Sequence, residues 1–288
     1  MKFKQISGSA DDFQQENPGV QKTSHTVLSV IVATALAATT ATAAGAAPVS
    51  PAKAPVGRAL TARPGAAVDT LPPGITKIAD GAILYRPPTL VRGTHPLIVL
   101  LHGADQGADE LISLFRREAD QRGLILLAPK SAGGTWDLAL SAARFHGRPP
   151  KNGEMPEFGP DVARIDAALS TAFQRTAIDP RLVILAGFSD GASYALSLGL
   201  ANSELVHGIL AFAPGMMIAP GQVSLTQRLF IAHGGTDRAI PIKVSRDGLA
   251  PALAAAGMKV QFREFYGGHE VNRKALDEGL TFVLQPAP

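Results

Sequence analysis

The chain has 288 residues, 46% of them hydrophobic, which is enough to bury a full core. Residues 1–70 hold six of the 27 Lys and Arg residues and four of the 24 Asp and Glu residues, leaving 21 and 20 for residues 71–288. A nearly neutral domain with no basic stripe argues against nucleic-acid binding. There is no cysteine, which excludes disulfides, thiolate zinc sites, thioether-linked haem and a lipoprotein anchor on cysteine.

Residues 1–47 are predicted to be an N-terminal extension with an export signal. A polar region, 1–26, precedes an uncharged run of Val, Leu, Ile, Ala and Thr over 27–47, which ends in small residues suited to signal peptidase. The polar region is long for a signal, and initiation at a non-Met codon for Val20 would explain it. An uncleaved membrane anchor over 27–47 is the alternative, but the run is only weakly hydrophobic and we favour cleavage. We expect an exported protein, periplasmic or secreted, with at most a transient membrane contact through this segment.

Residues 48–70 are rich in Pro, Ala and Gly and are predicted to be a linker, and residues 71–288 the folded domain. In the domain, short apolar runs alternate with helical patterns, which is typical of a parallel sheet flanked by helices. We see no internal repeat, and one domain suffices. The predicted fold class is α/β, with a mostly parallel sheet and helices on both faces.

The predicted elements follow in chain order. Strands are expected at 83–85, near an antiparallel edge, and at 97–101, 124–127, 182–186, 208–212, 229–232 and 260–265. Helices are expected at 106–122, 161–176, 190–200, 242–256 and 270–284. The Gly- and Pro-rich stretch over 131–158 predicts a long functional loop. About a dozen residues separate Gly215 from Arg228, so we expect no large cap domain and an open groove.

Gly187-Phe188-Ser189-Asp190-Gly191 is the most informative motif, a Gly-x-Ser-x-Gly between a predicted strand and a predicted helix. A serine hydroxyl is a poor nucleophile at neutral pH, so it must project from a sharp turn towards a base. The two glycines permit that turn. The pattern alone recurs by chance, but strand, turn and helix are all present, and we predict that Ser189 is the nucleophile.

Candidates for the acid and the base follow two later strands, at the sheet edge where ligands collect in such folds. Asp237 ends the run from His233, and His269 ends Gly267-Gly268-His269. His269 would take the Ser189 proton, and Asp237 would hold the imidazole tautomer. A simple turn aspartate and a surface-loop histidine are the alternatives, and Glu270 and Asp247 are further candidates for the acid.

Two other histidines, His102 and His233, also follow strands. Each precedes the nucleophile or the acid in the chain, so we expect them to brace loops by hydrogen bonds. The backbone N–H groups of Ala104 and Asp190 are predicted to form the oxyanion hole.

Trp136 and Met216 are candidate substrate-binding residues. Trp136, the only tryptophan, would either wall the acyl or alcohol pocket or anchor the long loop. Met216 would line the pocket or fill core. We expect no metal, because there is no His-Glu-x-x-His, and no nucleotide cofactor, because no dinucleotide fingerprint follows a first strand.

Four segments together carry a family resemblance: Leu100-Leu101-His102-Gly103, the Ser189 motif, His233 to Asp237 with Ile240-Pro241, and Gly267 to His269. The combination resembles the phospholipase/carboxylesterase branch of the α/β-hydrolases, and is also similar to polyhydroxybutyrate depolymerase-type and acyl-protein thioesterase-type enzymes. The resemblance implies a cofactor-free serine esterase with the triad Ser189, Asp237, His269, acting on small-molecule esters through an acyl-serine intermediate. A cysteine often follows the His-Gly pair in the depolymerase and feruloyl esterase group; Ala104 stands there here, which weakens assignment to a polymer-degrading subgroup.

The open groove favours short to medium acyl esters. Two other functions remain alternatives. A serine peptidase of the prolyl-oligopeptidase type shares the triad, although the accessory domain that usually binds the peptide is missing. A non-catalytic envelope binding protein would be marked by a broken triad, and no break is visible. The sequence leaves open the acyl chain length, the alcohol and the oligomeric state.

Overall fold

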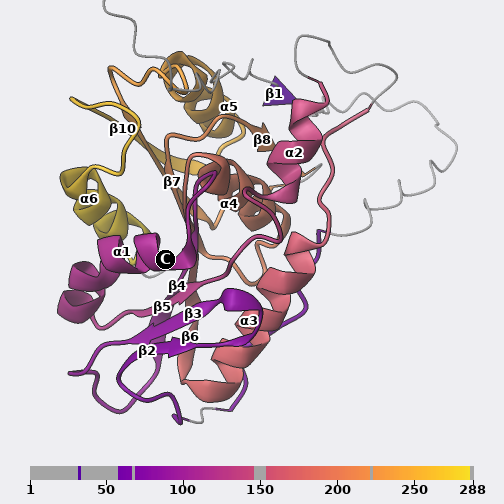
Figure 1. Cartoon of the computed structure of the whole chain (residues 1–288). Helices are drawn as coiled ribbons and strands as arrows, with labels where there is room; N and C mark the ends of the chain where they lie inside the picture. The colour runs from indigo at the N-terminus through magenta and orange to yellow at the C-terminus, as the bar shows by residue number, and fades with distance from the viewer. Residues whose placement is uncertain (1–31, 34–57, 67–68, 146–153, 221–222, 286–288) are drawn as a thin grey trace, which may run out of the picture.

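The computed structural model describes residues 32–33, 58–66, 69–145, 154–220 and 223–285. An eight-stranded sheet runs through the molecule in the order β10-β9-β7-β6-β4-β5-β3-β2 (Figure 1). Strand β3 (Ile83–Arg86) is antiparallel to both its neighbours, β2 (Gly74–Lys77) and β5 (Ile125–Ala128). The remaining strands pair in parallel: β4 (His95–Leu101), β6 (Ile178–Phe188), β7 (Gly208–Phe212), β9 (Arg228–Gly234) and β10 (Lys259–Phe265). The predicted fold class and the antiparallel edge are confirmed.

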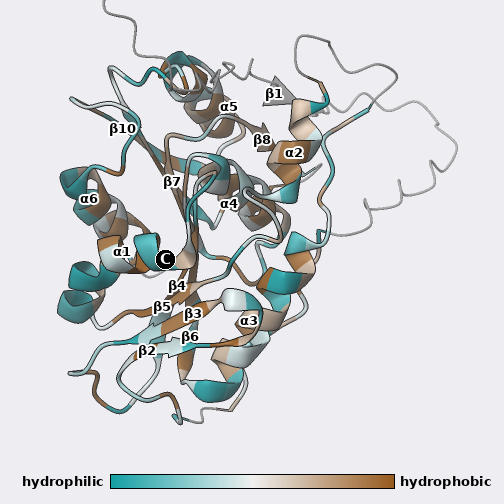
Figure 2. Ribbon diagram, viewed as in Figure 1, coloured by the Kyte–Doolittle hydropathy of each residue, from teal (hydrophilic) through white to brown (hydrophobic). Residues whose placement is uncertain are grey.

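Helices cover both faces of this sheet (Figure 1). One face carries α1 (Ala108–Arg122) and α6 (Arg273–Val283), and the other carries α3 (Asp161–Arg175), α4 (Asp190–Ala201) and α5 (Ala250–Ala255). Side chains alternate along a strand, so Leu97 and Val99 of β4 enter one core and Ile98 enters the other. Figure 2 shows hydrophobic residues along the central strands and hydrophilic ones on the outer sides of α1 and α6. Burial on both faces explains why these strands read as continuous apolar runs.

The structure departs from the predicted elements in three places. The long loop contains a short helix, α2 (Asp137–Ala143), which its Gly-rich surroundings hide in the sequence. The helix predicted over 242–256 is instead a π-helical segment, η2 (Val244–Leu249), followed by α5, because Pro251 lacks the N–H that a continuous helix would need. Strand β2 and the two-residue β8 (Met217–Ile218), which pairs with β1 (Val32–Ala33), were not predicted.

Part of the predicted linker packs against the domain. Leu60 is buried in the core, and its N–H donates to Oδ1 of Asn202 at 2.8 Å. The N–H groups of Thr61 and Ala62 both donate to Oδ1 of Asp166. The predicted export segment lies outside the described residues, apart from β1. No helix in the described ranges is long and apolar enough to cross a membrane.

The carboxyl ends of β6, β9 and β10 lie at one edge of the sheet, where the loops that follow them meet. In the described part of the segment between β7 and β9, β8 is the only regular element, so no cap domain covers this edge from there.

Candidate active site

Ser189 occupies the sharp turn between β6, which ends at Phe188, and α4, which begins at Asp190. Its backbone has φ 56° and ψ −121°, a region that costs a non-glycine residue about 1–3 kcal/mol. The turn is close to its neighbours: a Cβ on Gly187 would overlap the carbonyl oxygen of Gly191, and one on Gly191 would overlap that of Leu101. Neither glycine of the motif can therefore carry a side chain unless the neighbouring backbone moves.

The three side chains predicted to act together lie within hydrogen-bonding distance. Nε2 of His269 is 2.9 Å from Oγ of Ser189, and Nδ1 is 2.7 Å from Oδ2 of Asp237. A carboxylate only accepts, so Nδ1 carries the proton and Nε2 accepts from the serine hydroxyl. The Asp237 side chain has no exposed surface, whereas that of His269 is 24% exposed. Solvent and substrate can thus reach the histidine but not the acid.

The loops that carry Asp237 and His269 are tied to each other. Oδ1 of Asp237 accepts from the N–H groups of Ala239 and Ile240 at 2.8 and 2.9 Å, which fixes the carboxylate by local turn geometry. Both the N–H and the hydroxyl of Thr236 donate to the carbonyl of Gly267. These bonds set the spacing between acid and base.

The prediction that His102 and His233 brace loops by hydrogen bonds is confirmed. Nδ1 of His102 donates to the Gly103 carbonyl, and Nε2 accepts from the N–H of Ser131. Nε2 of His233 donates to the Ile240 carbonyl at 2.9 Å. Both rings are buried, and burial lowers the pKa of each.

The two N–H groups predicted for the oxyanion hole are free to donate to a ligand atom. In the described part of the chain no hydrogen bond occupies the N–H of Ala104 or Asp190. Their loops lie together, since a Cβ built on Gly103 would be 3.4 Å from Cβ of Ser189. The Gly103 N–H donates to Oε1 of Gln106, which holds the loop after β4.

A segment that sequence reasoning did not single out, residues 131–136, braces both halves of this arrangement. The Thr135 hydroxyl donates to Oδ2 of Asp190 at 2.6 Å. The carbonyl of Gly134 accepts from the N–H of Asp105 at 2.7 Å. In the sequence only Trp136 and the position of this segment at the start of the 131–158 stretch marked it.

Neither predicted substrate-binding side chain offers a surface to a ligand. Trp136 is fully buried: its ring packs 4.9 Å from His102 and 5.0 Å from Tyr194, and its Nε1–H donates to the His102 carbonyl. Of its two predicted roles it fills that of loop anchor. Met216 is 3% exposed and packs in the core.

Two carboxylates, Asp137 and Asp161, fasten the base of the long loop. Asp161 accepts from the N–H groups of Ala132 and Asp137, and Asp137 accepts from the N–H of Asp161, so each caps the start of the other's helix. Burial raises the pKa of Asp161. Within the described ranges, no group of three or more His, Cys, Asp or Glu residues could hold a metal ion.

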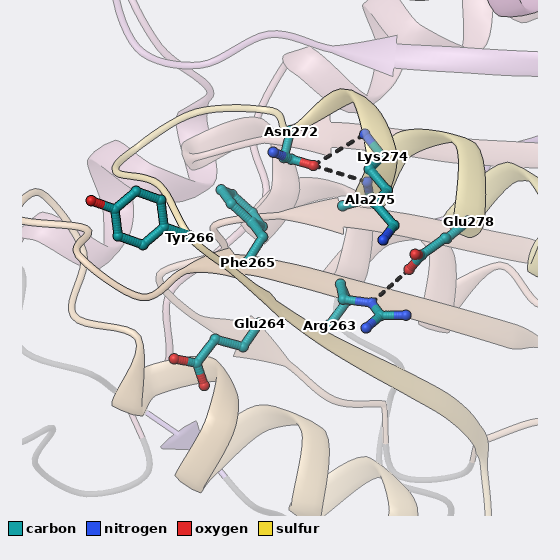
Figure 3. A pocket seen from close by; sticks show the side chains of 8 residues that line it. All are labelled: Arg263, Glu264, Phe265, Tyr266, Asn272, Lys274, Ala275 and Glu278. Carbon is teal, nitrogen blue, oxygen red and sulfur yellow. Dashed lines mark hydrogen bonds and ion pairs between the residues drawn. The ribbon is translucent and has the colours of Figure 1, made fainter.

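A pocket of about 320 Å³, lined by charged, amide and aromatic side chains, lies between the end of β10 and the start of α6 (Figure 3). Phe265 and Asn272 line it and flank the loop that carries His269. Arg263 and Glu278 form an ion pair across it at 2.6 Å, and Tyr266, 97% exposed, projects at its margin. The lining residues are Arg263, Glu264, Phe265, Tyr266, Asn272, Lys274, Ala275 and Glu278.

Comparison with known proteins relates part of this chain to a family. Residues 162–285, which include Ser189, Asp237 and His269, match the family described as Phospholipase/Carboxylesterase. An acetylxylan esterase from Coprinopsis cinerea is 31% identical over 115 residues. That match spans 38% of this chain and 28% of the length of the relative.

Solved esterase structures share the fold. Esterase PE8 superposes with a TM-score of 0.51 at 24% identity, over 75% of this chain and 98% of that one. A phospholipase/carboxylesterase from Dyadobacter fermentans superposes with a TM-score of 0.52 at 19% identity, over 73% of this chain and 99% of that one. The carboxylesterase of Bacillus cereus superposes with a TM-score of 0.51 at 17% identity, over 70% of this chain and 92% of that one. Most of the chain therefore has the architecture of these esterases.

Proposed function

We propose that the protein is a serine carboxylic ester hydrolase, because residues 162–285 match the family described as Phospholipase/Carboxylesterase. The observation that carries the proposal is the imidazole of His269, whose two nitrogens bond Ser189 and Asp237 at 2.9 and 2.7 Å. The nucleophile, the base and the group that orients the base are thus already in hydrogen-bonding order.

Oγ of Ser189 attacks the ester carbonyl carbon as its proton passes to Nε2 of His269. The oxyanion that forms accepts from the N–H groups of Ala104 and Asp190. The C–O bond to the alcohol then breaks, the alcohol leaves with the proton from His269, and Ser189 remains acylated. A water molecule repeats the sequence: His269 takes its proton, the acid is released, and Ser189 regains its hydroxyl.

The two halves of the substrate face different surroundings in this proposal. The leaving alcohol takes its proton from His269, and the pocket of Figure 3 borders the loop that carries this histidine. Charged and amide side chains there, with the exposed ring of Tyr266, suit a hydroxyl-rich alcohol better than an aliphatic one. The partial likeness to an acetylxylan esterase is compatible with an acetylated saccharide. The absence of a cap between β7 and β9 in the described residues favours short to medium acyl groups.

Export is a separate part of the proposal. It rests on the composition of residues 27–47 alone.

A fluorophosphonate tests the chemistry directly. We expect the intact mass to increase by one adduct, mapped to Ser189, and Ser189→Ala to lose the adduct together with about 10⁴- to 10⁶-fold in kcat. Hydrolysis of p-nitrophenyl acetate, p-nitrophenyl butyrate, an acetylated xyloside and an aminoacyl-p-nitroanilide then identifies the substrate class. Folded protein that takes up no adduct would end the esterase proposal, and selective cleavage of the anilide would assign a peptidase instead.

A further inference from the structure

His233 is a buried histidine in contact with the acid of the triad. Its Nε2 lies 3.2 Å from Oδ2 of Asp237, the same oxygen that is 2.7 Å from Nδ1 of His269. Neither the His233 nor the Asp237 side chain has any exposed surface. One carboxylate oxygen is therefore shared by two imidazoles in a dry environment, where hydrogen bonds are strong.

The neighbours of His233 determine which nitrogen carries its proton. Nε2 faces two acceptors, the Ile240 carbonyl at 2.9 Å and Oδ2 of Asp237, so it must be protonated. Nδ1 is 2.8 Å from Oγ of Ser245, another fully buried group. The charged and titratable groups that act on the ring are Asp237 and His269, and burial holds the pKa of His233 below its ordinary value. The ring is then neutral, and Nδ1 accepts the Ser245 proton.

We propose that His233 is a positioning residue for the triad: its single Nε2–H, fixed by Ser245, is shared between the Ile240 carbonyl at 2.9 Å and Oδ2 of Asp237 at 3.2 Å, and holds that oxygen against His269. The inference rests on the proposed function. Oδ1 of Asp237 is already held by two backbone N–H groups, so the bond from His233 fastens the second end of the carboxylate. A carboxylate that is held through only one of its oxygens can rotate about χ2, a torsion with a broad range of allowed angles. That rotation moves Oδ2 relative to the imidazole. Displacements of about 1 Å cost up to ~100-fold in rate.

The same bond also disperses charge. A donor on Oδ2 takes up part of the carboxylate's negative charge, which would otherwise act fully on protonated His269. Removing it stabilises the imidazolium, which cannot accept the Ser189 proton. The acid limb of the pH profile of kcat/KM then moves to higher pH, a change that a purely structural role would not produce.

Four variants separate these effects. His233→Gln places an amide nitrogen near the position of Nε2, whereas the shorter side chain of His233→Asn reaches only the position of Nδ1. Ser245→Ala removes the hydroxyl that fixes the tautomer. Its control is Ser197→Ala, an equally buried hydroxyl that donates to the Ser193 carbonyl and accepts from the Ile218 N–H, neither of which belongs to the triad.

The measurements are the rate of fluorophosphonate labelling at Ser189 and the pH profile of kcat/KM for p-nitrophenyl acetate. We expect His233→Asn to lose about 10- to 100-fold in kcat with little change in KM, and His233→Gln to recover part of that loss. We expect Ser245→Ala to lose several-fold in kcat and to have the acid limb of its kcat/KM profile at higher pH. Ser197→Ala should match the unsubstituted enzyme in both measurements.

A folded His233→Asn with an unchanged labelling rate and pH profile overturns the inference and leaves the proposed function standing. If the unsubstituted protein is not labelled, the proposed function itself fails. If His233→Asn does not fold, the two serine variants decide, since equal rates and profiles for both would overturn the role of the fixed tautomer.

Discussion

Gly191 shows how tightly a single residue can be constrained at this site. A Cβ there would overlap the carbonyl oxygens of Leu101 and His102, whereas nothing lies within 4 Å of a Cβ on Gly268, a glycine in the His269 loop. Gly191→Ala must therefore push the nucleophile turn away from β4, and we expect it to lower the free energy of unfolding by about 1–3 kcal/mol and to impair ester hydrolysis.

Gly268→Ala is the matched control, and we expect its stability to stay within about 0.5 kcal/mol of the unsubstituted protein. Urea unfolding of the two variants makes the comparison. Equal stabilities would show that the turn after β6 relaxes without cost.

The meeting of Ser189, Asp237 and His269 could be predicted from the sequence because each lies within four residues of the end of a strand, and strand ends converge in this fold class. Thr135 could not, because its bond to Asp190 joins residues 55 positions apart in the chain and no local pattern marks it. The sequence did not decide between the two roles of Trp136 for a related reason. A ring that anchors a loop and a ring that lines a pocket have the same neighbours in the sequence.

At the level of elements, the segment 131–136 links the two strand ends that supply the proposed oxyanion hole. Thr135→Val keeps the shape of the side chain but removes the hydroxyl that bonds Asp190. We expect kcat for p-nitrophenyl acetate to fall about 10-fold with little change in KM, because the loss concerns the position of the Asp190 N–H in the transition state.

Thr135→Ser keeps the hydroxyl and should retain most of that activity. Steady-state kinetics of the two variants separates kcat from KM. A Thr135→Val enzyme with unchanged kcat would mean that α4 alone positions the N–H.

Helices and strands were predicted best where burial of one side makes hydrophobic residues recur at a regular spacing. Helix α3 buries Val162, Ile165 and Leu169 on one side, and that spacing is visible in the sequence. The π-helical segment η2 was not predicted, because an apolar pattern indicates a helix without distinguishing i→i+4 from i→i+5 bonding. Strand β2 carries an exposed Ile75 and a glycine start, so its pairing with β3 decides its structure.

For the molecule as a whole, composition and contact disagree about where the domain begins. Residues 58–66 have the composition of a linker, yet Leu60 is 2% exposed and bonds Asn202, 142 positions further along the chain. Composition indicates the structure that a segment prefers in isolation. A segment that packs against the domain is held by hydrogen bonds and contacts with residues far away in the chain. Long-range bonds of this kind fix both the edge of the domain and the loops around Ser189.

Two buried histidines should make the whole molecule less stable below neutral pH. Burial lowers the pKa of His102 and His233 below the ordinary value of 6.5, which both regain on unfolding. As the pH falls through 6.5 the unfolded chain binds protons that the folded chain does not, so the free energy of unfolding decreases, by at most about 1.4 kcal/mol per pH unit for each histidine. Asp161 acts in the opposite sense: burial raises its pKa above 3.8, so its contribution is present at low pH and lost as the pH rises through its folded pKa.

The two histidines each lower the free energy of unfolding as the pH falls from 7 to 5, and we expect urea unfolding across that range to give falling midpoints. His102→Gln removes one of the two titrating groups, so its stability should start lower and depend less steeply on pH. Midpoints of the unsubstituted protein that stay constant from pH 7 to 5 would mean that the folded state accepts these protons, and that neither ring is held neutral by its surroundings.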